Sequence, residues 1–374
     1  FSSMFLEAVF ELIKLWFGGY GNFYNNQGRL FNMQIKTFSG NFVEIGKQQG
    51  KVYHKRRMSF KNLKIDPKLF GNQLRVYKKF YPELLKEFEG IAEAGNFDKN
   101  KLIYHFITAE IKCYNDWFGS KKACTIFGFK NKDKLFVGRN YDWAPKTLGL
   151  FEIYKVQNPQ RNSFIALTDG GYGSEAGTNV KNLFYNADDA INDKGLFIGL
   201  TFAYSDNWSY GLSCVHMTKL IAETCATVQE AIKVFEKVPL CCPKNFFIAD
   251  KNGHMVIIEH TSQKFKVIYP KNGILIQTNH YVDPELAKED TVLKRVPIHN
   301  THLRYHETFQ RINFSRNKFN LNKVINVLGK KGTYTCQNFP GVKTIWTLAL
   351  DMTNKKYKVY WNIFEKRKEK VLRI

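Results

Sequence analysis

The chain has 374 residues, of which 44% are hydrophobic and 15% aromatic. This composition predicts a folded globular protein with a sizeable core and excludes an intrinsically disordered chain. The formal net charge of +23, from 56 Lys and Arg against 33 Asp and Glu, would suit an anionic partner. The lysines are scattered along the whole chain, however, without a recognition helix, zinc-finger spacing or RNA-binding signature, so nucleic-acid binding is not expected.

The chain opens with an apolar segment followed by a linker. Residues 1–17 carry charges at roughly helical spacing, which predicts an amphipathic helix that packs on the domain; contact with a membrane surface is a less favoured alternative. No basic leader precedes this segment and no apolar run reaches eighteen residues, so we expect no secretory signal, no spanning helix and a cytoplasmic location. Residues 18–28, rich in Gly, Asn and Tyr, are typical of a linker. Residues 1–32 are therefore an expected extension of a domain that begins near Met33.

The domain itself is expected to change from helical to strand-rich near residue 120. Residues 33–38 alternate like a strand, and the chain from 42 to 117 is mainly helical, with a proline and an acid in the first turn of 81–88. A hairpin is then predicted around the polar turn 130–134. Further strand-like runs follow at 150–156, 163–167, 196–201, 246–248, 255–259, 265–268, 274–277, 344–350 and 356–361.

A predicted helix at 218–238 interrupts these strands, and Thr227 is a plausible N-cap at which it restarts. Helices first, then many strands with helices between them, predict a layered α+β fold with a predominantly antiparallel sheet.

Cysteine usage argues against both a disulfide scaffold and a metal site. The seven cysteines are few, odd in number and irregularly spaced, which is typical of a reducing compartment. Cys241 and Cys242 are adjacent, and no Cys-x-x-Cys spacing occurs anywhere. We therefore expect no cysteine-based zinc site and no metal or other cofactor.

Cys124 stands out because of the residues that follow it. It opens the first strand of the predicted hairpin, and the second strand ends in Gly-Arg-Asn-Tyr-Asp-Trp at 138–143. A hairpin of this length returns Arg139 and Asp142 to the side of Cys124. The arginine would lower the pKa of the thiol, and the aspartate could hold an amine. A plain core role for this cysteine is the alternative.

The segment Cys124-Thr125 followed by 138–142 resembles the cysteine N-terminal-nucleophile hydrolases. That group includes fungal penicillin acyl-transferases, bile-salt hydrolases, penicillin V acylases and acid-ceramidase-like amidases. Other segments are similar to the fungal acyl-transferase branch and occur in the same chain order, at 39–50, 82–92, 192–196, 247–253, Glu259 and 278–280. The resemblance covers much of the chain from 39 to 280 and is less clear in the last third.

The resemblance implies a four-layer αββα fold that is made as an inactive precursor. Cleavage between Ala123 and Cys124 would give a mainly helical small chain, 33–123, and a catalytic large chain, 124–374, which together form one domain. The freed α-amine of Cys124, with a pKa of about 7.7–8.0, could then serve as the base for its own thiol.

The resemblance also implies roles for individual residues. Asn279 would donate its side-chain amide to the oxyanion, Asp142 would orient the new amine, and Arg139 would balance charge around the thiol. Arg304 is similar to a helix arginine of the family, with a weaker role.

Three positions depart from the family pattern. Gln337 stands where an arginine is common, so a ligand or structural contact would be missing. Thr201, in the turn that often presents an asparagine, leaves the second oxyanion donor to a backbone amide or to the Tyr204 hydroxyl. Ala123 replaces a glycine and is small enough for cleavage.

The expected activity is hydrolysis of a linear, non-peptide amide with an apolar acyl group, or transfer of that acyl group to an amine. An apolar acyl pocket is predicted from the aromatic residues Phe202, Tyr204, Trp208 and Tyr210, which could equally be core. Two alternatives stay open: a non-cleaving, non-catalytic protein of the same fold, and a basic protein that binds lipid or nucleic acid.

Overall fold

The computed structural model describes residues 34–114, 123–148, 151–169, 184–295 and 300–374. The amphipathic segment and linker expected within 1–32 lie outside these residues. From Ile35 onward the chain forms one compact unit, and the fold below is the fold of that unit.

Helices precede the first long strands and alternate with strands after them. Among the described residues the helices are α2 (Phe42–Lys55), α3 (Pro67–Phe80), α4 (Pro82–Gly95), α5 (Lys99–Cys113), α7 (Cys214–Thr224), α8 (Val228–Lys237), α9 (Val292–Arg295), α10 (Thr301–Ser315) and α11 (Leu321–Leu328). None of these helices has the length and apolar character needed to cross a membrane. The strands are β1 (Lys36–Ser39), β2 (Ala123–Asn131), β3 (Lys134–Trp143), β4 (Glu152–Gln157), β5 (Phe164–Thr168), β6 (Asp189–Asn192), β7 (Leu196–Phe202), β8 (Lys244–Asp250), β9 (Met255–His260), β10 (Phe265–Ile268), β11 (Ile274–Gln277), β12 (Asn338–Phe339), β13 (Val342–Asp351), β14 (Lys356–Trp361) and β15 (Lys368–Leu372).

The described strands form two sheets. The first has the order β1-β4-β5-β6-β7-β8-β9-β10, and the second has the order β11-β2-β3-β13-β14-β15 with β12 paired to β13. Every pair of neighbours is antiparallel except β1 and β4, which are parallel. The sheets are thus predominantly antiparallel, as predicted.

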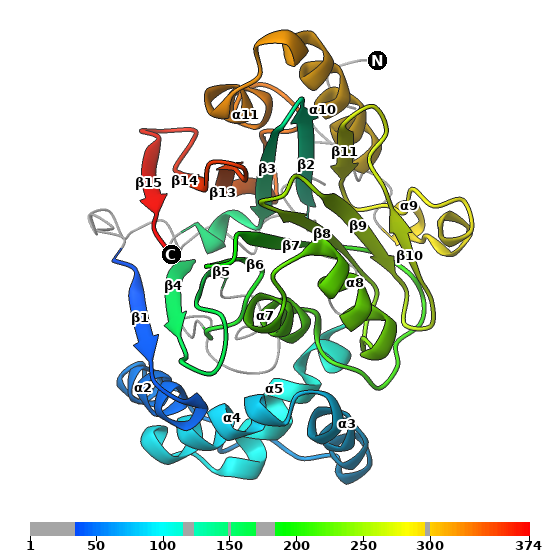
Figure 1. The fold of residues 1–374 in the computed structure, drawn as a ribbon. Helices are drawn as coiled ribbons and strands as arrows, with labels where there is room; N and C mark the ends of the chain where they lie inside the picture. Colours follow the sequence, from blue (N-terminus) through cyan, green and yellow to red (C-terminus); the bar gives the residue numbers. More distant parts are fainter. Residues whose placement is uncertain (1–33, 115–122, 149–150, 170–183, 296–299) are drawn as a thin grey trace, which may run out of the picture. The chain divides into compact units, whose positions relative to one another are not determined.

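The two sheets pack face to face between two layers of helices. Strand β2 of the second sheet contacts β7 and β8 of the first. Apolar side chains of α2–α5, α7 and α8 share one core with the first sheet, while those of α10 and α11 share another with β2, β3, β11 and β13. Figure 1 shows α2–α5 in blue and cyan on one side and α10 and α11 in orange on the other. This arrangement confirms the predicted four-layer αββα fold.

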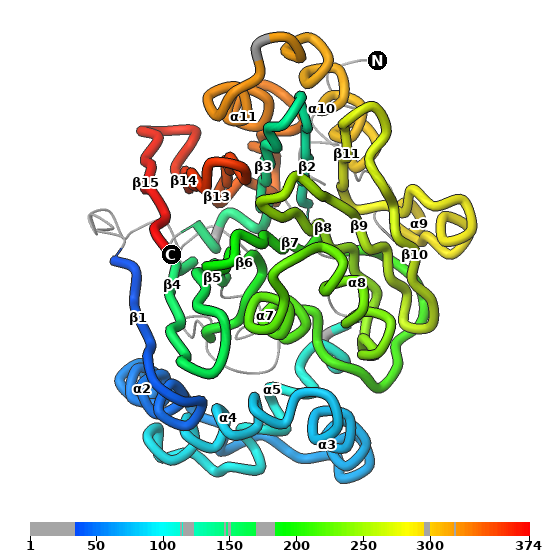
Figure 2. Tube along the Cα trace, viewed as in Figure 1, coloured from blue at the N-terminus to red at the C-terminus, as the bar shows by residue number. Residues whose placement is uncertain are grey.

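Local sequence explains the elements closest to the site. The polar turn after Asn131 connects β2 and β3 into a hairpin longer than the one predicted. Figure 2 shows β11 running beside β2, far from it in the sequence. The helix predicted at 218–238 is two helices, α7 and α8. The side chain of Thr227 caps the second by accepting the N–H of Glu230 at 3.2 Å.

Candidate active site

Cys124 is the second residue of β2 and lies beside a cavity lined by residues of both sheets. In the β2–β3 register Cys124 is opposite Tyr141, and Ala123 is opposite Asp142. The Cys124 side chain is buried, with 3% of its surface exposed. The hairpin therefore brings the residues at the end of the second strand beside the peptide bond between Ala123 and Cys124.

Asn279 and Arg304 hold the main chain of Cys124 on both sides. The N–H of Cys124 donates to Asn279 Oδ1 at 2.8 Å. Arg304 Nη2 donates to the same oxygen at 2.8 Å, and Nη1 donates to the carbonyl oxygen of Cys124 and to Thr125 Oγ1. Asn279 Nδ2 in turn donates to the carbonyl oxygen of Phe202 at 2.8 Å. Two residues distant in the sequence thus fix the position of the cysteine.

Arg139 reaches from β3 across to the first sheet. Its Nε donates to Asp189 Oδ1 at 2.7 Å and its Nη2 donates to the carbonyl oxygen of Leu200 at 3.2 Å, while Nη1 has no hydrogen-bond partner among the described residues. Burial raises the pKa of the Cys124 thiol; the Arg139 guanidinium lowers it, but burial dominates. The thiol of the uncut chain is therefore protonated at neutral pH.

The two carboxylate oxygens of Asp142 differ in their hydrogen bonding. Oδ1 accepts the hydroxyl proton of Thr344 at 2.6 Å, and Oδ2 has no hydrogen-bond partner among the described residues. Burial raises the pKa of Asp142 to about 6, although Arg304, Thr344 and Gln337 act to lower it. Gln337 thus lies beside Asp142 in the site. At neutral pH Asp142 is charged and can accept one more proton donor.

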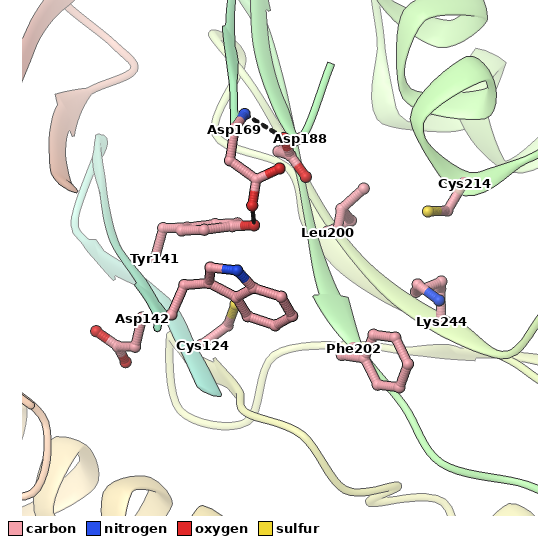
Figure 3. Close-up of a pocket in the computed structure, with 10 residues that line it drawn as sticks. Cys124, Tyr141, Asp142, Asp169, Asp188, Leu200, Phe202, Cys214 and Lys244 are labelled. Atoms are coloured by element: carbon pink, nitrogen blue, oxygen red, sulfur yellow. Dashed lines mark hydrogen bonds between the residues drawn. The ribbon is translucent and has the colours of Figure 1, made fainter. Parts of the chain in front are cut away.

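A small cavity of about 20 Å³ adjoins the thiol. Its described lining comprises Cys124, Tyr141, Asp142, Trp143, Asp169, Asp188, Leu200, Phe202, Cys214 and Lys244. Figure 3 shows Cys124 near the middle, with Asp169 and Asp188 on one side and Lys244 and Cys214 on another. The wall therefore combines apolar side chains with charged ones.

The weaker sequence candidates occupy different positions around this cavity. Phe202 lines it, whereas Trp208 and Tyr210 are 43% and 37% exposed. Thr201 is buried, and its hydroxyl donates to the carbonyl oxygen of Thr278 at 2.6 Å. The Tyr204 hydroxyl is buried within electrostatic reach of Arg304 and Cys124.

Several charged residues of the site were missed from the sequence. Tyr141 donates its hydroxyl proton to Asp169, and the N–H of Asp169 donates to Asp188 Oδ2 at 3.2 Å. Burial and the neighbouring Asp169 raise the pKa of Asp188 well above its usual value. The only sequence feature that could have indicated these residues is the pair of adjacent acids, Asp188 and Asp189. No such feature marks Lys244, at the start of β8.

Solved structures similar to this one in part include three hydrolases. A penicillin V acylase from Agrobacterium tumefaciens is 18% identical, over 67% of this chain and 86% of that chain, with a TM-score of 0.46. A mutant of a conjugated bile acid hydrolase from Clostridium perfringens is 14% identical, over 67% and 92%, with a TM-score of 0.46. A Caenorhabditis elegans N-acylethanolamine-hydrolyzing acid amidase ortholog is 15% identical, over 62% and 93%, with a TM-score of 0.44.

A match to a family sequence model shows which family the chain belongs to. No curated protein sequence matches the chain. A family model described as acyl-coenzyme A:6-aminopenicillanic acid acyl-transferase matches residues 129–366, which is more than half of the chain. The match spans β3, with Arg139 and Asp142, as well as Asn279 and Arg304. The chain therefore belongs to the acyl-coenzyme A:6-aminopenicillanic acid acyl-transferase family.

Proposed function

We propose that the protein is a cysteine amidohydrolase or acyltransferase that activates itself by cleavage between Ala123 and Cys124. The observation that carries this proposal is the geometry at Cys124. Its N–H and its carbonyl oxygen are held by Asn279 and Arg304, while Asp142 lies opposite Ala123 with one carboxylate oxygen uncommitted. Any buried main chain needs hydrogen-bond partners, but a nucleophile whose own amine must be positioned needs them from side chains that stay in place after cleavage.

The cleavage step starts from the protonated thiol. Asp142 accepts the thiol proton by way of a water molecule, because the β2–β3 register places its side chain on the face opposite the thiol, and the sulfur attacks the carbonyl carbon of Ala123. The C–S bond forms, the C–N bond to Cys124 breaks, and the proton passes to the departing nitrogen. Water then hydrolyses the thioester, which leaves a carboxylate on Ala123 and a free thiol and α-amine on Cys124. Arg139 favours the step because its unpartnered Nη1 can stabilise the thiolate as it forms.

After cleavage the same residue supplies both nucleophile and base. The α-amine, with a pKa of about 7.7–8.0, takes the thiol proton and returns it to the leaving amine of the substrate. Asp142 and Asn279 Oδ1 orient that amine. Asn279 Nδ2 uses one N–H on Phe202 and keeps a second for the oxyanion of the tetrahedral intermediate. The resulting acyl-enzyme passes its acyl group to water or to an amine.

The substrate class follows from the family and the cavity wall. Family membership favours a small molecule with a linear amide bond, and Leu200 and Phe202 give the cavity an apolar side suited to an acyl group. Lys244 adds a charge to that wall, so acyl groups with a polar end belong in the substrate panel. We propose hydrolysis as the main reaction because water needs no second binding site.

The two pieces of the cleaved chain are proposed to stay together. Glu87 of α4, before the cleavage site, forms an ion pair with Lys219 of α7 at 2.5 Å, and Tyr81 donates to Glu223 Oε2 at 2.5 Å. All four side chains are buried. Separation of the pieces would expose these charges together with the core that α2–α5 share with the first sheet.

Trapping of the acyl-enzyme tests the proposal. Purified protein is incubated with a panel of linear N-acyl amides and quenched with acid, and its peptides are analysed by mass. We expect an acyl increment on the peptide that begins at Cys124. The increment should be absent in Cys124→Ser and unchanged in Cys336→Ser, which alters a buried thiol outside the cavity. An increment on another residue, or amide turnover that survives Cys124→Ser, would contradict the assignment.

A further inference from the structure

A second cluster of reactive side chains lies next to the cavity and takes no part in the proposed reaction. Glu110 comes from α5, whereas Cys241 and Cys242 precede β8. One ligand atom of each lies within 4.8 Å of the others, and all three side chains are buried. We propose that these residues form a binding site for a thiophilic divalent cation, of which zinc is the physiological candidate.

The distance between Cys241 and Glu110 matches tetrahedral coordination, and the Cys242 thiol lies within 4.8 Å of both ligand atoms. Cys241 Sγ and Glu110 Oε2 are 3.6 Å apart. Ligands bound to zinc at about 2.3 Å for sulfur and about 2.0 Å for oxygen lie roughly 3.5 Å apart in a tetrahedron. The structure therefore needs little rearrangement to place a metal where the Cys241 thiol proton now lies. The cavity lined by Cys214 and Lys244 adjoins the cluster, so a water molecule from it can supply the fourth ligand.

Neighbouring groups hold the carboxylate in an orientation suited to a ligand. Glu110 Oε2, which faces Cys241, also accepts the N–H of Cys214 at 2.7 Å. The other oxygen, Oε1, lies 2.9 Å from the ammonium of Lys244. Such contacts around a ligand orient it and tune its affinity. Because Lys244 pairs with Oε1, it leaves Oε2 available for the metal.

Charge balance also favours a divalent cation. When it binds, the two S–H bonds of Cys241 and Cys242 break, two metal–sulfur bonds form, and two protons leave for solvent. The metal and two thiolates are neutral together, as are Glu110 and Lys244. The buried cluster therefore has the same net charge with and without the metal, which avoids the cost of an uncompensated charge in the interior.

Direct binding measurements on the full chain test this site. The purified, reduced protein is stripped with a chelator, dialysed against zinc or cadmium, and analysed for metal per chain; the cadmium form is also examined for its thiolate charge-transfer absorption. We expect one ion per chain, the thiolate absorption, and release of two protons per ion in an unbuffered titration. Binding is expected to weaken at least about 100-fold in Cys241→Ser and in Cys242→Ser, since even groups behind the ligands contribute 10–100-fold.

Cys225→Ser is the matched control, because this buried thiol lies outside the cluster and its loss leaves binding unchanged. Circular dichroism and elution volume establish that each variant is folded, and Glu110→Gln, which keeps the side-chain shape, gives a second test with an expected loss of at least about 10-fold. The proposal is overturned if the folded native protein binds no cadmium, or if the Cys241→Ser/Cys242→Ser double variant binds it as tightly as the native chain.

Discussion

Two buried ion pairs lie on opposite sides of the first sheet and differ in how completely they are satisfied. Lys219 of α7 lies 2.6 and 2.5 Å from the two oxygens of Glu87, and Gln49 donates to the same carboxylate at 2.9 Å. Arg139 pairs with Asp189 at 2.7 Å but leaves Nη1 without a partner among the described residues.

The two pairs differ in what their cations can do. The charge of Lys219 is structural, whereas that of Arg139 can act on a reaction. The Lys219 pair has all its carboxylate oxygens engaged and joins two helices. The guanidinium of Arg139 lies close enough to Cys124 to lower the pKa of its thiol. A buried cation with an unused N–H donor can stabilise a negative charge that forms later, whereas a fully paired cation has no donor available for it. Each prediction below sets a residue of the Arg139 region against its counterpart in the Lys219 region.

Removal of the two cations gives the largest expected effect. Arg139→Met and Lys219→Met each leave a buried carboxylate unpaired and lower the free energy of unfolding by about 3–5 kcal/mol. Removal of the acid as well, in Arg139→Met/Asp189→Leu and Lys219→Met/Glu87→Leu, should recover most of that loss. Urea unfolding and gel analysis of cleavage check both points. Only the variants at Arg139 should fail to cleave; normal cleavage in Arg139→Met/Asp189→Leu would remove the distinction between the pairs.

The buried side-chain amides of Asn279 and Gln49 give a second test of the difference between the two regions. Asn279→Ala removes the proposed oxyanion donor and should lower kcat by about 10²–10³, measured per cleaved molecule and with little change in KM. Gln49→Ala removes a donor to Glu87 and should lower the free energy of unfolding by about 1–3 kcal/mol while kcat stays unchanged. An unaltered kcat in Asn279→Ala would show that the oxyanion is stabilised elsewhere.

Two acids with raised pKa values offer a test through pH. Burial raises the pKa of Asp142 to about 6 and that of Glu223 to about 7, from ordinary values of 3.8 and 4.5. The folded state binds more protons than the unfolded state within these windows, so stability falls as pH rises from 3.8 to 6 and from 4.5 to 7. In an uncut Cys124→Ala background, Asp142→Asn and Glu223→Gln should each raise the free energy of unfolding by about 3 kcal/mol at pH 8.

The same substitutions should have no effect on stability below about pH 3, where both carboxyls are mostly protonated in either state. In chains that keep Cys124, only Asp142→Asn should prevent cleavage, and native cleavage should slow as pH falls below about 6. Cleavage by the Asp142→Asn variant at the native rate would exclude this carboxylate from the reaction.

Two glycines give the smallest expected effects. A Cβ added at Gly199 would lie 2.7 Å from Asp189 Oδ1, and one added at Gly46 would lie 2.0 Å from the carbonyl oxygen of Glu87. Gly199→Ala should lose about 1–3 kcal/mol of stability through overpacking, and Gly46→Ala at least as much, because the oxygen that it meets belongs to the backbone. Only Gly199→Ala displaces the partner of Arg139, so only this variant should lower kcat, by roughly tenfold. Equal kcat values for the two variants would indicate that the position of Asp189 does not matter to catalysis.

The part of the site that lies within one hairpin was predictable from the sequence. The polar turn between two apolar runs fixed the β2–β3 pairing, and this pairing alone places Arg139 and Asp142 near Cys124. The order of helices and strands predicted a layered α+β fold, and the family resemblance predicted its four layers. The positions of Asn279 and Arg304 came only from the resemblance, because 155 and 180 residues separate them from Cys124.

Contacts between the sheets were not predictable in this way. Arg139 meets Asp189 only because β3 of one sheet packs over β6 of the other, and no local pattern encodes which strands face each other. Glu110 likewise meets Cys241 through the packing of α5 beside the segment before β8, at a separation of 131 residues. The adjacent cysteines lack a Cys-x-x-Cys spacing, and nothing in their local sequence indicates that Glu110 is a third ligand.

Intact mass under denaturing conditions, with N-terminal sequencing of any fragments, tests the central claim most directly. The account predicts two fragments, the larger beginning Cys124-Thr125-Ile126, and a single uncut chain in Cys124→Ala. An uncut native chain of 43.6 kDa would contradict it, because Cys124 would then have no free amine and the proposed reaction no base.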